Sequence, residues 1–220
     1  MKSKMYEIGI KYQNDKITHH RYDLIYPQFL QDKVDDDIVI LEIGLGDNKN
    51  GTGKSNNFWK EYFNKSVLYI MDKDYEYNDG ISVVLKGDQS NIEDLKRVKE
   101  IIGKCDLIVD DGSHQPEHQI KTFLYFFEHL LNDGGIYIIE DIECNYWNSK
   151  STVYGYEIGH MSVINFLMSK IDSINSEFSK KNNSLKLSKI TFAKNCIIIQ
   201  KQTEEEKNND LREYRFNNML

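Results

Sequence analysis

Short apolar runs that end in or are followed by an acidic residue leave few folds open to this sequence. They recur from residue 38 onward, and segments with helical periodicity lie between them. Strands are expected at Ile38–Ile43, Val67–Met71, Ile81–Leu85, Asp106–Val109 and Ile136–Glu140, and helices at Asn56–Phe63, Ile92–Ile102 and Pro116–Leu131. Strands that alternate with crossover helices form a parallel sheet covered by helices on both faces.

The pattern changes after residue 150. A long helix is expected around Tyr156–Ile174, followed by strands at Lys189–Ala193 and Cys196–Lys201. Two strands so close in sequence can pair only through a tight turn, which predicts an antiparallel hairpin. The predicted fold is therefore α/β, with a mostly parallel seven-stranded sheet that ends in this hairpin. The segments Met1–Ile10 and Thr203–Asp210 look solvated and poorly constrained.

Composition restricts the class of protein. A length of 220 residues suits one well-buried domain. A net charge of −7 argues against nucleic-acid binding, which normally needs a basic face. The 3 cysteines are scattered, which favours a reduced, cytoplasmic compartment. No stretch approaches the roughly 18 apolar residues of a membrane span, so neither a membrane nor a nucleic-acid partner is expected.

The stretch Leu41–Trp59 contains two glycine-rich signals. Gly51-Thr52-Gly53-Lys54-Ser55 looks like the end of a P-loop, but that motif needs a glycine where Asn48 stands. The dinucleotide fingerprint fails as well, because its third glycine would fall at Lys49. Glu42-x-Gly44-x-Gly46 at a strand end remains. Its glycines allow a ligand to approach closely, and its carboxylate could receive an ammonium group, although a simple strand-to-helix turn is the alternative.

Acids or acid pairs follow strand after strand, and the carboxyl ends of parallel strands meet at one crevice. Asp72 could accept both hydroxyls of a ribose, whereas Asp88 could equally be a helix cap or turn acid. The full set at the strand ends is Glu42, Asp72, Asp88, Asp110, Asp111, Glu140 and Asp141.

The most specific chemistry lies in Asp110-Asp111-Gly112-Ser113-His114 and in Glu140-Asp141. Carboxylates gathered on adjacent strand ends repel each other unless a cation separates them, and oxygen ligands suit Mg²⁺. His114 is close enough in sequence to share the site, and an imidazole is a natural general base. The alternative for His114 is a structural role at the start of the next helix.

With these residues in place, the chain resembles the class I S-adenosylmethionine (SAM)-dependent, Mg²⁺-dependent sugar O-methyltransferases of macrolide biosynthesis, of the mycinamicin and tylosin type. It also resembles relatives encoded in polysaccharide clusters. The resemblance runs from about Asn14 to Trp147 and includes Asp15-Lys16 with His20-x-Tyr22 upstream. The remaining motifs are Glu42-Ile43-Gly44-Leu45-Gly46, Phe58-Trp59-x-x-Tyr62-Phe63, Gly87-Asp88-Gln89-Ser90, Asp110-Asp111-Gly112-Ser113-His114, Gly134-Gly135-Ile136-Tyr137 and Glu140-Asp141.

The resemblance implies a Rossmann-like methyltransferase domain over residues 38–202, an N-terminal segment over 1–37 that covers the active site, and a polar tail over 203–220. It implies that Asp111, Glu140 and Asp141 bind Mg²⁺, with His114 as the base. The implied SAM contacts are Glu42, Gly44, Gly46, Asp72, Asp88, Gln89 and Asp110. The acceptor would be a sugar on a small molecule or glycan, and relatives generally self-associate. Some family members carry a large N-terminal domain, where this sequence has only about 37 residues.

Other functions compete with this interpretation. A Mg²⁺-dependent methyltransferase of catechols or other small diols would keep the fold but commonly uses a lysine base. A P-loop protein would use Lys54 and Ser55. A non-catalytic subunit with the SAM-binding fold is disfavoured by the complete set of Asp111, His114, Glu140 and Asp141.

Overall fold

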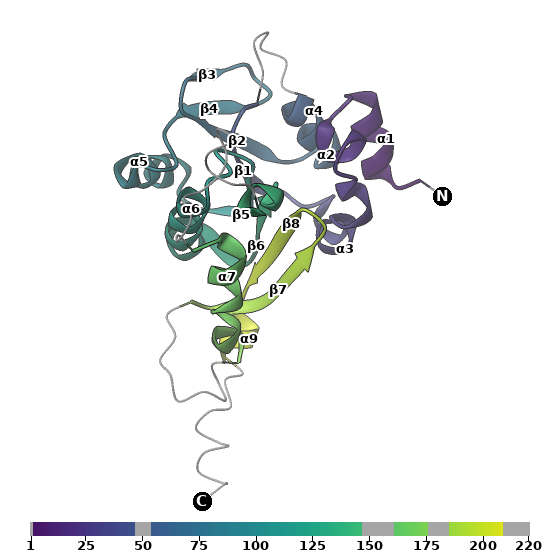
Figure 1. The fold of residues 1–220 in the computed structure, drawn as a ribbon. Helices are drawn as coiled ribbons and strands as arrows, with labels where there is room; N and C mark the ends of the chain where they lie inside the picture. Colours follow the sequence, from purple (N-terminus) through teal and green to yellow (C-terminus); the bar gives the residue numbers. More distant parts are fainter. Residues whose placement is uncertain (1, 47–53, 147–160, 176–184, 209–220) are drawn as a thin grey trace, which may run out of the picture.

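The computed structural model describes residues 2–46, 54–146, 161–175 and 185–208 (Figure 1). The described strands are β1 (Val39–Ile43), β2 (Val67–Asp72), β3 (Tyr77–Asn78), β4 (Val83–Lys86), β5 (Cys105–Asp110), β6 (Leu131–Glu140), β7 (Leu187–Ala193) and β8 (Cys196–Lys201). They form one sheet in the order β3-β4-β2-β1-β5-β6-β8-β7. The five central strands, from β4 to β6, run parallel, whereas β3, β7 and β8 pair antiparallel to their neighbours.

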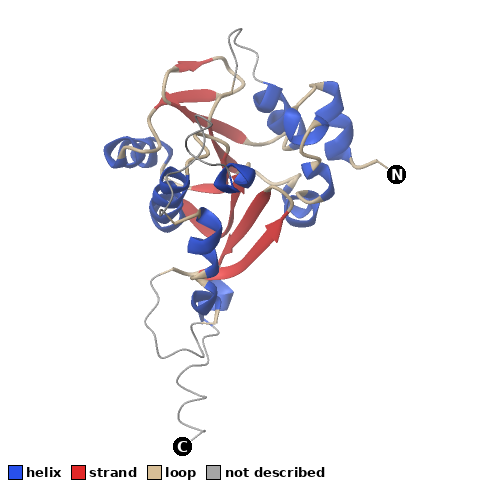
Figure 2. Ribbon diagram, viewed as in Figure 1, coloured by secondary structure: helices blue, strands red, loops and turns tan. Residues whose placement is uncertain are grey.

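Helices cover both faces of this sheet (Figure 2). The first part of the chain forms α1 (Lys4–Lys11), α2 (Asp15–Thr18), η1 (Tyr22–Leu24), α3 (Pro27–Leu30) and η2 (Gln31–Lys33). The later helices are α4 (Lys54–Tyr62), α5 (Ile92–Ile102), α6 (Pro116–His129), η3 (Ile142–Tyr146), α7 (Val163–Met168), α8 (Ile171–Ile174) and α9 (Glu204–Asn208). One hydrophobic core joins the sheet to α5, α6 and α7, and a second joins its other face to α1–α4.

The alternation of side chains along each strand explains the two cores. Ile40 of β1 packs in the core under α1–α4, and its neighbour Leu41 packs in the core under α5–α7. Trp59 and Phe123 are fully buried on opposite faces, and burial of an aromatic side chain of this size contributes about 1.5–3 kcal/mol. The sheet is thus a two-sided platform that holds its strand ends in fixed register.

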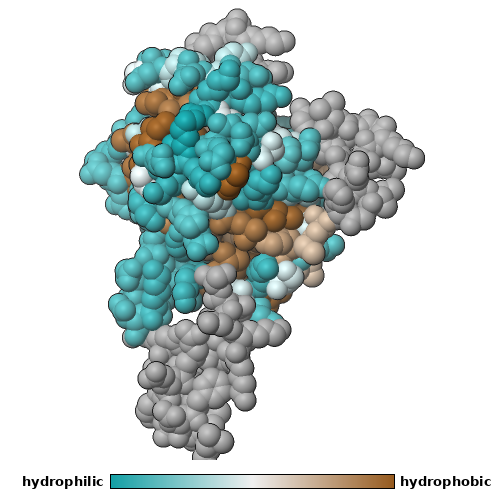
Figure 3. Space-filling view, turned by 90° about the vertical axis from the view of Figure 1, so that its left-hand side faces the viewer, coloured by the Kyte–Doolittle hydropathy of each residue, from teal (hydrophilic) through white to brown (hydrophobic). Residues whose placement is uncertain are grey.

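The outer surface of the face seen in Figure 3 is mostly hydrophilic, with separate hydrophobic areas between hydrophilic residues. Within the described residues, no helix has both the length and the apolar composition that crossing a membrane requires.

The strand and hairpin predictions are confirmed with shifts of a few residues at some ends. β4 begins at Val83 rather than Ile81, because the Asp79 carboxylate accepts the backbone N–H groups of Ile81 and Ser82 in a turn. β6 begins earlier than expected, at Leu131, and continues through Gly134, whose φ is +71°. The two-residue β3 adds an edge strand to the predicted seven.

Two expectations were wrong. The N-terminal segment is not solvated over its described residues, because α1 buries Met5 and Ile8 in the core and Ser3 caps its first turn. The long helix expected around Tyr156–Ile174 is, where described, two short helices, α7 and α8; residues 156–160 lie outside the described residues. A helix as short as α1 shows too few apolar repeats for periodicity to identify it.

Candidate active site

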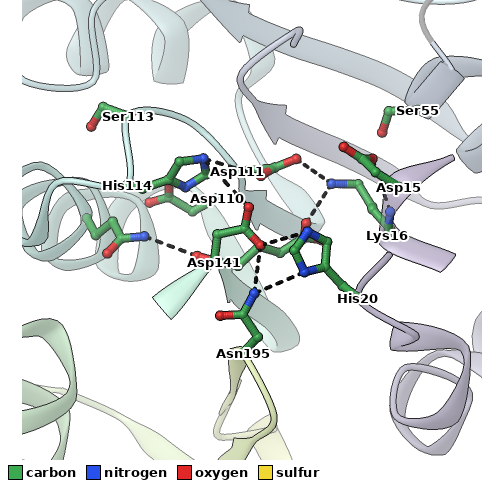
Figure 4. Close-up of polar contacts among 12 residues, drawn as sticks. Asp15, Lys16, His20, Ser55, Asp110, Asp111, Ser113, His114, Asp141 and Asn195 are labelled. Atoms are coloured by element: carbon green, nitrogen blue, oxygen red, sulfur yellow. Dashed lines mark hydrogen bonds and ion pairs between the residues drawn. The ribbon is translucent and has the colours of Figure 1, made fainter. Parts of the chain in front are cut away.

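Acidic side chains from three neighbouring strands meet at the carboxyl edge of the sheet (Figure 4). Glu42 lies in β1, Asp111 follows β5, and Glu140 and Asp141 lie at the end of β6. The sheet order reverses at β1, with β2 on one side and β5 on the other. Ligands of open α/β sheets bind at such a reversal, outside the carboxyl ends of the strands.

The glycine turn after β1 is shaped by the loop after β5. Gly44 has a φ of +94°, and a Cβ at this position would lie 2.3 Å from the backbone oxygen of Asp111. Its N–H donates to the Met71 carbonyl at 2.9 Å. Gly46 also has a positive φ, +69°, but no atom lies within 4 Å of the place a Cβ would take. Gly44 is therefore required by close packing, whereas Gly46 is required only by its backbone conformation.

Lys16 of α2 projects into the carboxylate group and is 1% exposed. Its Nζ lies 2.6 Å from Asp111 Oδ2, 2.7 Å from Glu140 Oε2 and 3.2 Å from Glu42 Oε1. Burial by itself would lower the pKa of Lys16, but attraction to Asp111, Glu140 and Glu42 outweighs burial and raises the pKa well above its usual value. The three N–H donors of the ammonium match these three oxygens in number.

Glu42 is fully engaged by the protein. Besides Lys16, the Ser55 hydroxyl lies 2.5 and 2.7 Å from its two oxygens, and Trp59 Nε1 donates to Oε1 at 3.2 Å. The side chain is 1% exposed. Ser55 therefore binds the carboxylate of Glu42 in the Glu42-x-Gly44-x-Gly46 motif, and its hydroxyl is engaged there. Residues 47–53 of the P-loop-like stretch lie outside the described residues.

Asp141 is held through one oxygen. The Tyr22 hydroxyl lies 3.1 Å from Oδ1, Asn195 Nδ2 donates to the same oxygen at 3.1 Å, and His20 Nε2 lies 3.5 Å from it. Oδ2 instead faces His114 Nε2 at 3.9 Å. Asp111 is arranged in the same way, with Oδ2 on Lys16 and Oδ1 3.9 Å from His114 Nε2. Each aspartate thus keeps an oxygen directed toward His114.

The proton positions on His20 follow from its neighbour. Asn195 Oδ1 accepts the N–H of Glu143 at 2.9 Å, which fixes Nδ2 as the donor. Nδ2 lies 3.1 Å from His20 Nδ1, so Nδ1 accepts and neutral His20 carries its proton on Nε2, toward Asp141. His20 orients Asp141 and has no free nitrogen with which to act as a base.

Three of the five described non-glycine residues with positive φ lie in the same place, and the other two are Gln13 and Arg21. His114, Asp141 and Asn195 have φ values of +55°, +54° and +62°. Left-handed conformations are unfavourable for residues other than glycine and persist only where the surrounding structure enforces them. Their clustering around one small volume supports a functional role for His114 and Asp141.

The geometry fits a divalent cation. One ligand atom each from Asp111, His114 and Asp141 lies within 4.8 Å of the other two. Mg²⁺ bonds of 2.0–2.1 Å place opposite ligands about 4.2 Å apart, so the oxygens of Asp111 and Asp141 are close enough to share one ion with His114 beside it. Among the described residues, His20, Asp141 and Glu143 form a second group of this size, but the proton on His20 Nε2 argues against it.

Glu140 lies deeper than the two aspartates. It is 1% exposed, and its Oε1 accepts a hydrogen bond of 2.6 Å from the Tyr26 hydroxyl. With Lys16 on Oε2, each oxygen has one partner, and a carboxylate has about four lone-pair positions. Glu140 therefore retains capacity for a cation, and its role as a metal ligand stays a prediction.

Asp110 points away from this group. It is fully buried, and its carboxylate accepts hydrogen bonds from Gln89 Nε2 at 3.1 Å and Tyr137 OH at 2.9 Å. Burial raises the pKa of Asp110 to about 6, although these hydrogen bonds oppose the shift. Gln89, 5% exposed, also accepts the Ser113 N–H at 2.6 Å. A side-chain contact of either residue with a cofactor would require this packing to open, and the predicted contacts stay predictions.

The acids after β2 and β4 have local partners. Asp72 accepts the Leu45 N–H at 3.1 Å and the Asp74 N–H at 2.8 Å, which joins the β1 turn to the end of β2. Asp88 accepts the Ser90 N–H at 2.8 Å, which matches the turn role left open for it. Asp88 also lines a cavity of about 530 Å³ with Lys73, Lys86 and Arg97.

Comparison with known proteins identifies the class of fold. No family model matches the chain. In structure, the MycE methyltransferase from the mycinamycin biosynthetic pathway, determined in complex with Mg and SAH, matches with a TM-score of 0.80 at 24% identity. The match covers 94% of this chain and 56% of that one. The fold is that of a Rossmann-like class I methyltransferase, as expected.

Curated relatives narrow the class. An 8-demethyl-8-alpha-L-rhamnosyl tetracenomycin-C 2'-O-methyltransferase of Streptomyces olivaceus is 32% identical over 152 residues, which are 67% of this chain and 40% of the relative. Mycinamicin VI 2''-O-methyltransferase of Micromonospora griseorubida is 31% identical over 66% of this chain and 38% of its own length. The chain is a relative of the sugar O-methyltransferases that modify macrolides and tetracenomycin, and it spans about two fifths of the length of these two proteins.

The residues of the candidate site that the sequence did not indicate come mostly from the N-terminal segment. The sequence gives Asp15-Lys16 and His20-x-Tyr22 no chemistry beyond the resemblance. It links Ser55 only to the P-loop alternative and does not indicate Tyr26 or Asn195. The signal available for Lys16 was its position in a motif upstream of the first strand; for Asn195, it was a place in a tight hairpin turn at the same edge of the sheet.

Proposed function

We propose that the protein is a SAM-dependent O-methyltransferase that methylates a hydroxyl of a sugar, with Mg²⁺ bound by Asp111, Glu140 and Asp141. The observation that carries the proposal is that one oxygen of Asp111 and one of Asp141 lie within 4.8 Å of each other and of His114 Nε2, which brings two of the proposed metal ligands beside the proposed base. The similarity to sugar O-methyltransferases supports the acceptor class. The similarity in fold to MycE, whose structure was determined with Mg and SAH bound, supports the cofactors.

The proposed reaction gives the aspartates and His114 different roles. Asp111 and Asp141 present oxygens at the ends of adjacent strands, where they would orient neighbouring hydroxyls of the acceptor through the cation. A bound Mg²⁺ would supply positive charge that lowers the pKa of the acceptor hydroxyl. His114 Nε2 would take the hydroxyl proton, and the acceptor oxygen would bond to the SAM methyl group as the carbon–sulfur bond breaks and SAH leaves. Alignment of oxygen, carbon and sulfur would supply much of the rate.

The competing functions fit the site less well. A catechol-type enzyme would use a lysine base, but each donor of Lys16 faces a carboxylate oxygen. A P-loop protein would use the Ser55 hydroxyl, which is occupied by Glu42.

The decisive variant is His114→Ala. Loss of a general base lowers turnover by roughly 10²–10⁴-fold. SAH binding should be unchanged, since the predicted cofactor contacts remain. The assay is transfer of radiolabelled methyl from SAM to a panel of rhamnosides, nucleotide sugars and catechols, with and without EDTA. His129→Ala, on an exposed residue at the far end of α6, is the matched control.

Full turnover by His114→Ala would reject the assigned base. Methylation of catechols in preference to every sugar would reject the acceptor class. A thermal shift with ATP and none with SAH would reject the methyltransferase assignment altogether.

A further inference from the structure

The ammonium group of Lys16 occupies a position surrounded by carboxylates. Its Nζ lies within 3.2 Å of Glu42, Asp111 and Glu140, and the Lys16 side chain is 2% exposed. These acids come from β1, the loop after β5 and the end of β6, so the ammonium joins three adjacent strands. The lysine itself arrives from α2, outside the sheet (Figure 4).

Asp111 faces two cation positions. Its Oδ2 lies 2.6 Å from Lys16 Nζ, and its Oδ1 is directed toward His114 and Asp141, where the proposed divalent ion would bind. Glu140 likewise gives Oε2 to the ammonium. Carboxylates that bridge two cations are the usual construction of a two-metal site, in which the ions lie about 3.5–4 Å apart. Here one of the two cations is a side chain.

We propose that Lys16 takes the place of a second divalent ion and so limits the site to one. The inference rests on the proposed function for the position of the first ion. The oxygens of Glu42, Asp111 and Glu140 are hard ligands that would bind Mg²⁺ or Mn²⁺ if the ammonium were removed. Because the lysine is part of the chain, the second positive charge is present whatever the free metal concentration, and α2 is anchored to the strand ends.

The test replaces Lys16 by methionine, whose unbranched side chain is one heavy atom shorter and carries no charge. Mn²⁺ is the probe, and its stoichiometry is measured by equilibrium dialysis and by electron paramagnetic resonance. The full-length wild-type protein is expected to bind one Mn²⁺ with the spectrum of an isolated ion. Lys16→Met is expected to bind two, with the spectral coupling of a close pair.

Lys11→Met is the matched control. Lys11 lies in the same N-terminal segment but pairs with Glu61 at the surface, with both side chains more than a third exposed. Its replacement should leave one bound Mn²⁺ and an unchanged spectrum.

Lys16→Met could unfold in EDTA, since it leaves buried carboxylates without a counter-ion. In that event, Mn²⁺ should restore the near-ultraviolet circular dichroism, with two ions taken up on refolding. A folded variant that binds a single ion, or an unfolded one that Mn²⁺ does not restore, overturns the inference about Lys16 alone. A wild-type protein that binds no Mn²⁺ overturns the proposed metal site as well, so the two failures are distinguishable.

Discussion

The acids at the two sides of the sheet edge have different kinds of partners. On the side of β2 and β4, Asp72 and Asp88 accept backbone N–H groups of nearby turns, such as Asp74 and Ser90. On the side of β5 and β6, Asp111 and Glu140 bond to Lys16, which lies 95 and 124 residues away in sequence. The same sequence signal, an acid after a strand, therefore corresponds to two physical situations.

The two sides of the sheet edge differ in how firmly their carboxylates are oriented before a ligand binds. Local turns hold Asp72, which is half-buried, and Asp88, which is exposed, so that their remaining lone pairs can meet a ligand. The network from the N-terminal segment instead selects one oxygen of Asp111 and of Asp141 and leaves the other directed toward His114. Preorganised charges of this kind are what stabilisation of a transition state needs.

The largest effect is expected from Asp141→Asn, on the networked side. The substitution removes the charge that faces His114, and a metal-bound reaction centre is worth several kcal/mol, so kcat should fall on the order of 10³-fold. Methyl transfer at saturating SAM and Mg²⁺ measures it. Asp35→Asn, at an exposed position in the N-terminal segment, should leave kcat unchanged. Retention of turnover within about threefold by Asp141→Asn would contradict the contrast between the two sides.

A smaller effect is expected from Tyr22→Phe, which removes one hydroxyl from Asp141 Oδ1 and leaves Oδ2, the oxygen that faces His114, intact. Partners of metal ligands typically affect metal affinity by about 10–100-fold. The Mg²⁺ concentration for half-maximal activity should therefore rise by about tenfold, while kcat at saturating Mg²⁺ recovers. Tyr75→Phe, 41% exposed beyond β2, is the control. A loss of kcat that excess Mg²⁺ does not restore would show that Tyr22 acts on the reaction itself rather than through Asp141.

The smallest effects are expected on the side of β2 and β4. Asp72→Asn should weaken SAH binding by about tenfold, since one hydrogen bond to a charged group is worth about 1.5 kcal/mol. Asp88→Asn should change it by less, because its oxygen already closes the turn to Ser90. Isothermal titration with SAH measures both, with exposed Asp74→Asn as the control. If Asp88→Asn weakened SAH binding more than Asp72→Asn did, Asp88 rather than Asp72 would be the main contact to the cofactor.

Much of the fold was predictable from local patterns. The central strands are nearly continuous apolar runs, which is typical of a sheet buried on both faces, and the closeness of the last two strands required a hairpin. The convergence of Asp111, His114 and Asp141 was also predictable, because adjacent parallel strands end at one edge. Asp111 faces Lys16 and Asp110 faces the opposite side of the sheet, because consecutive side chains alternate in direction at the end of β5. This alternation could have been read from the sequence.

Local sequence specifies the sheet, the acids at its strand ends and the loop that carries His114, since each depends on residues close together in the chain. Only the tertiary structure decided which carboxylate oxygens face His114. That choice depends on Lys16, His20, Tyr22 and Asn195, which reach the site from α2, the segment after it and the β7–β8 turn. Hydrogen bonds act over about 3 Å, and no spacing rule relates such distant residues until folding has brought their atoms within that range.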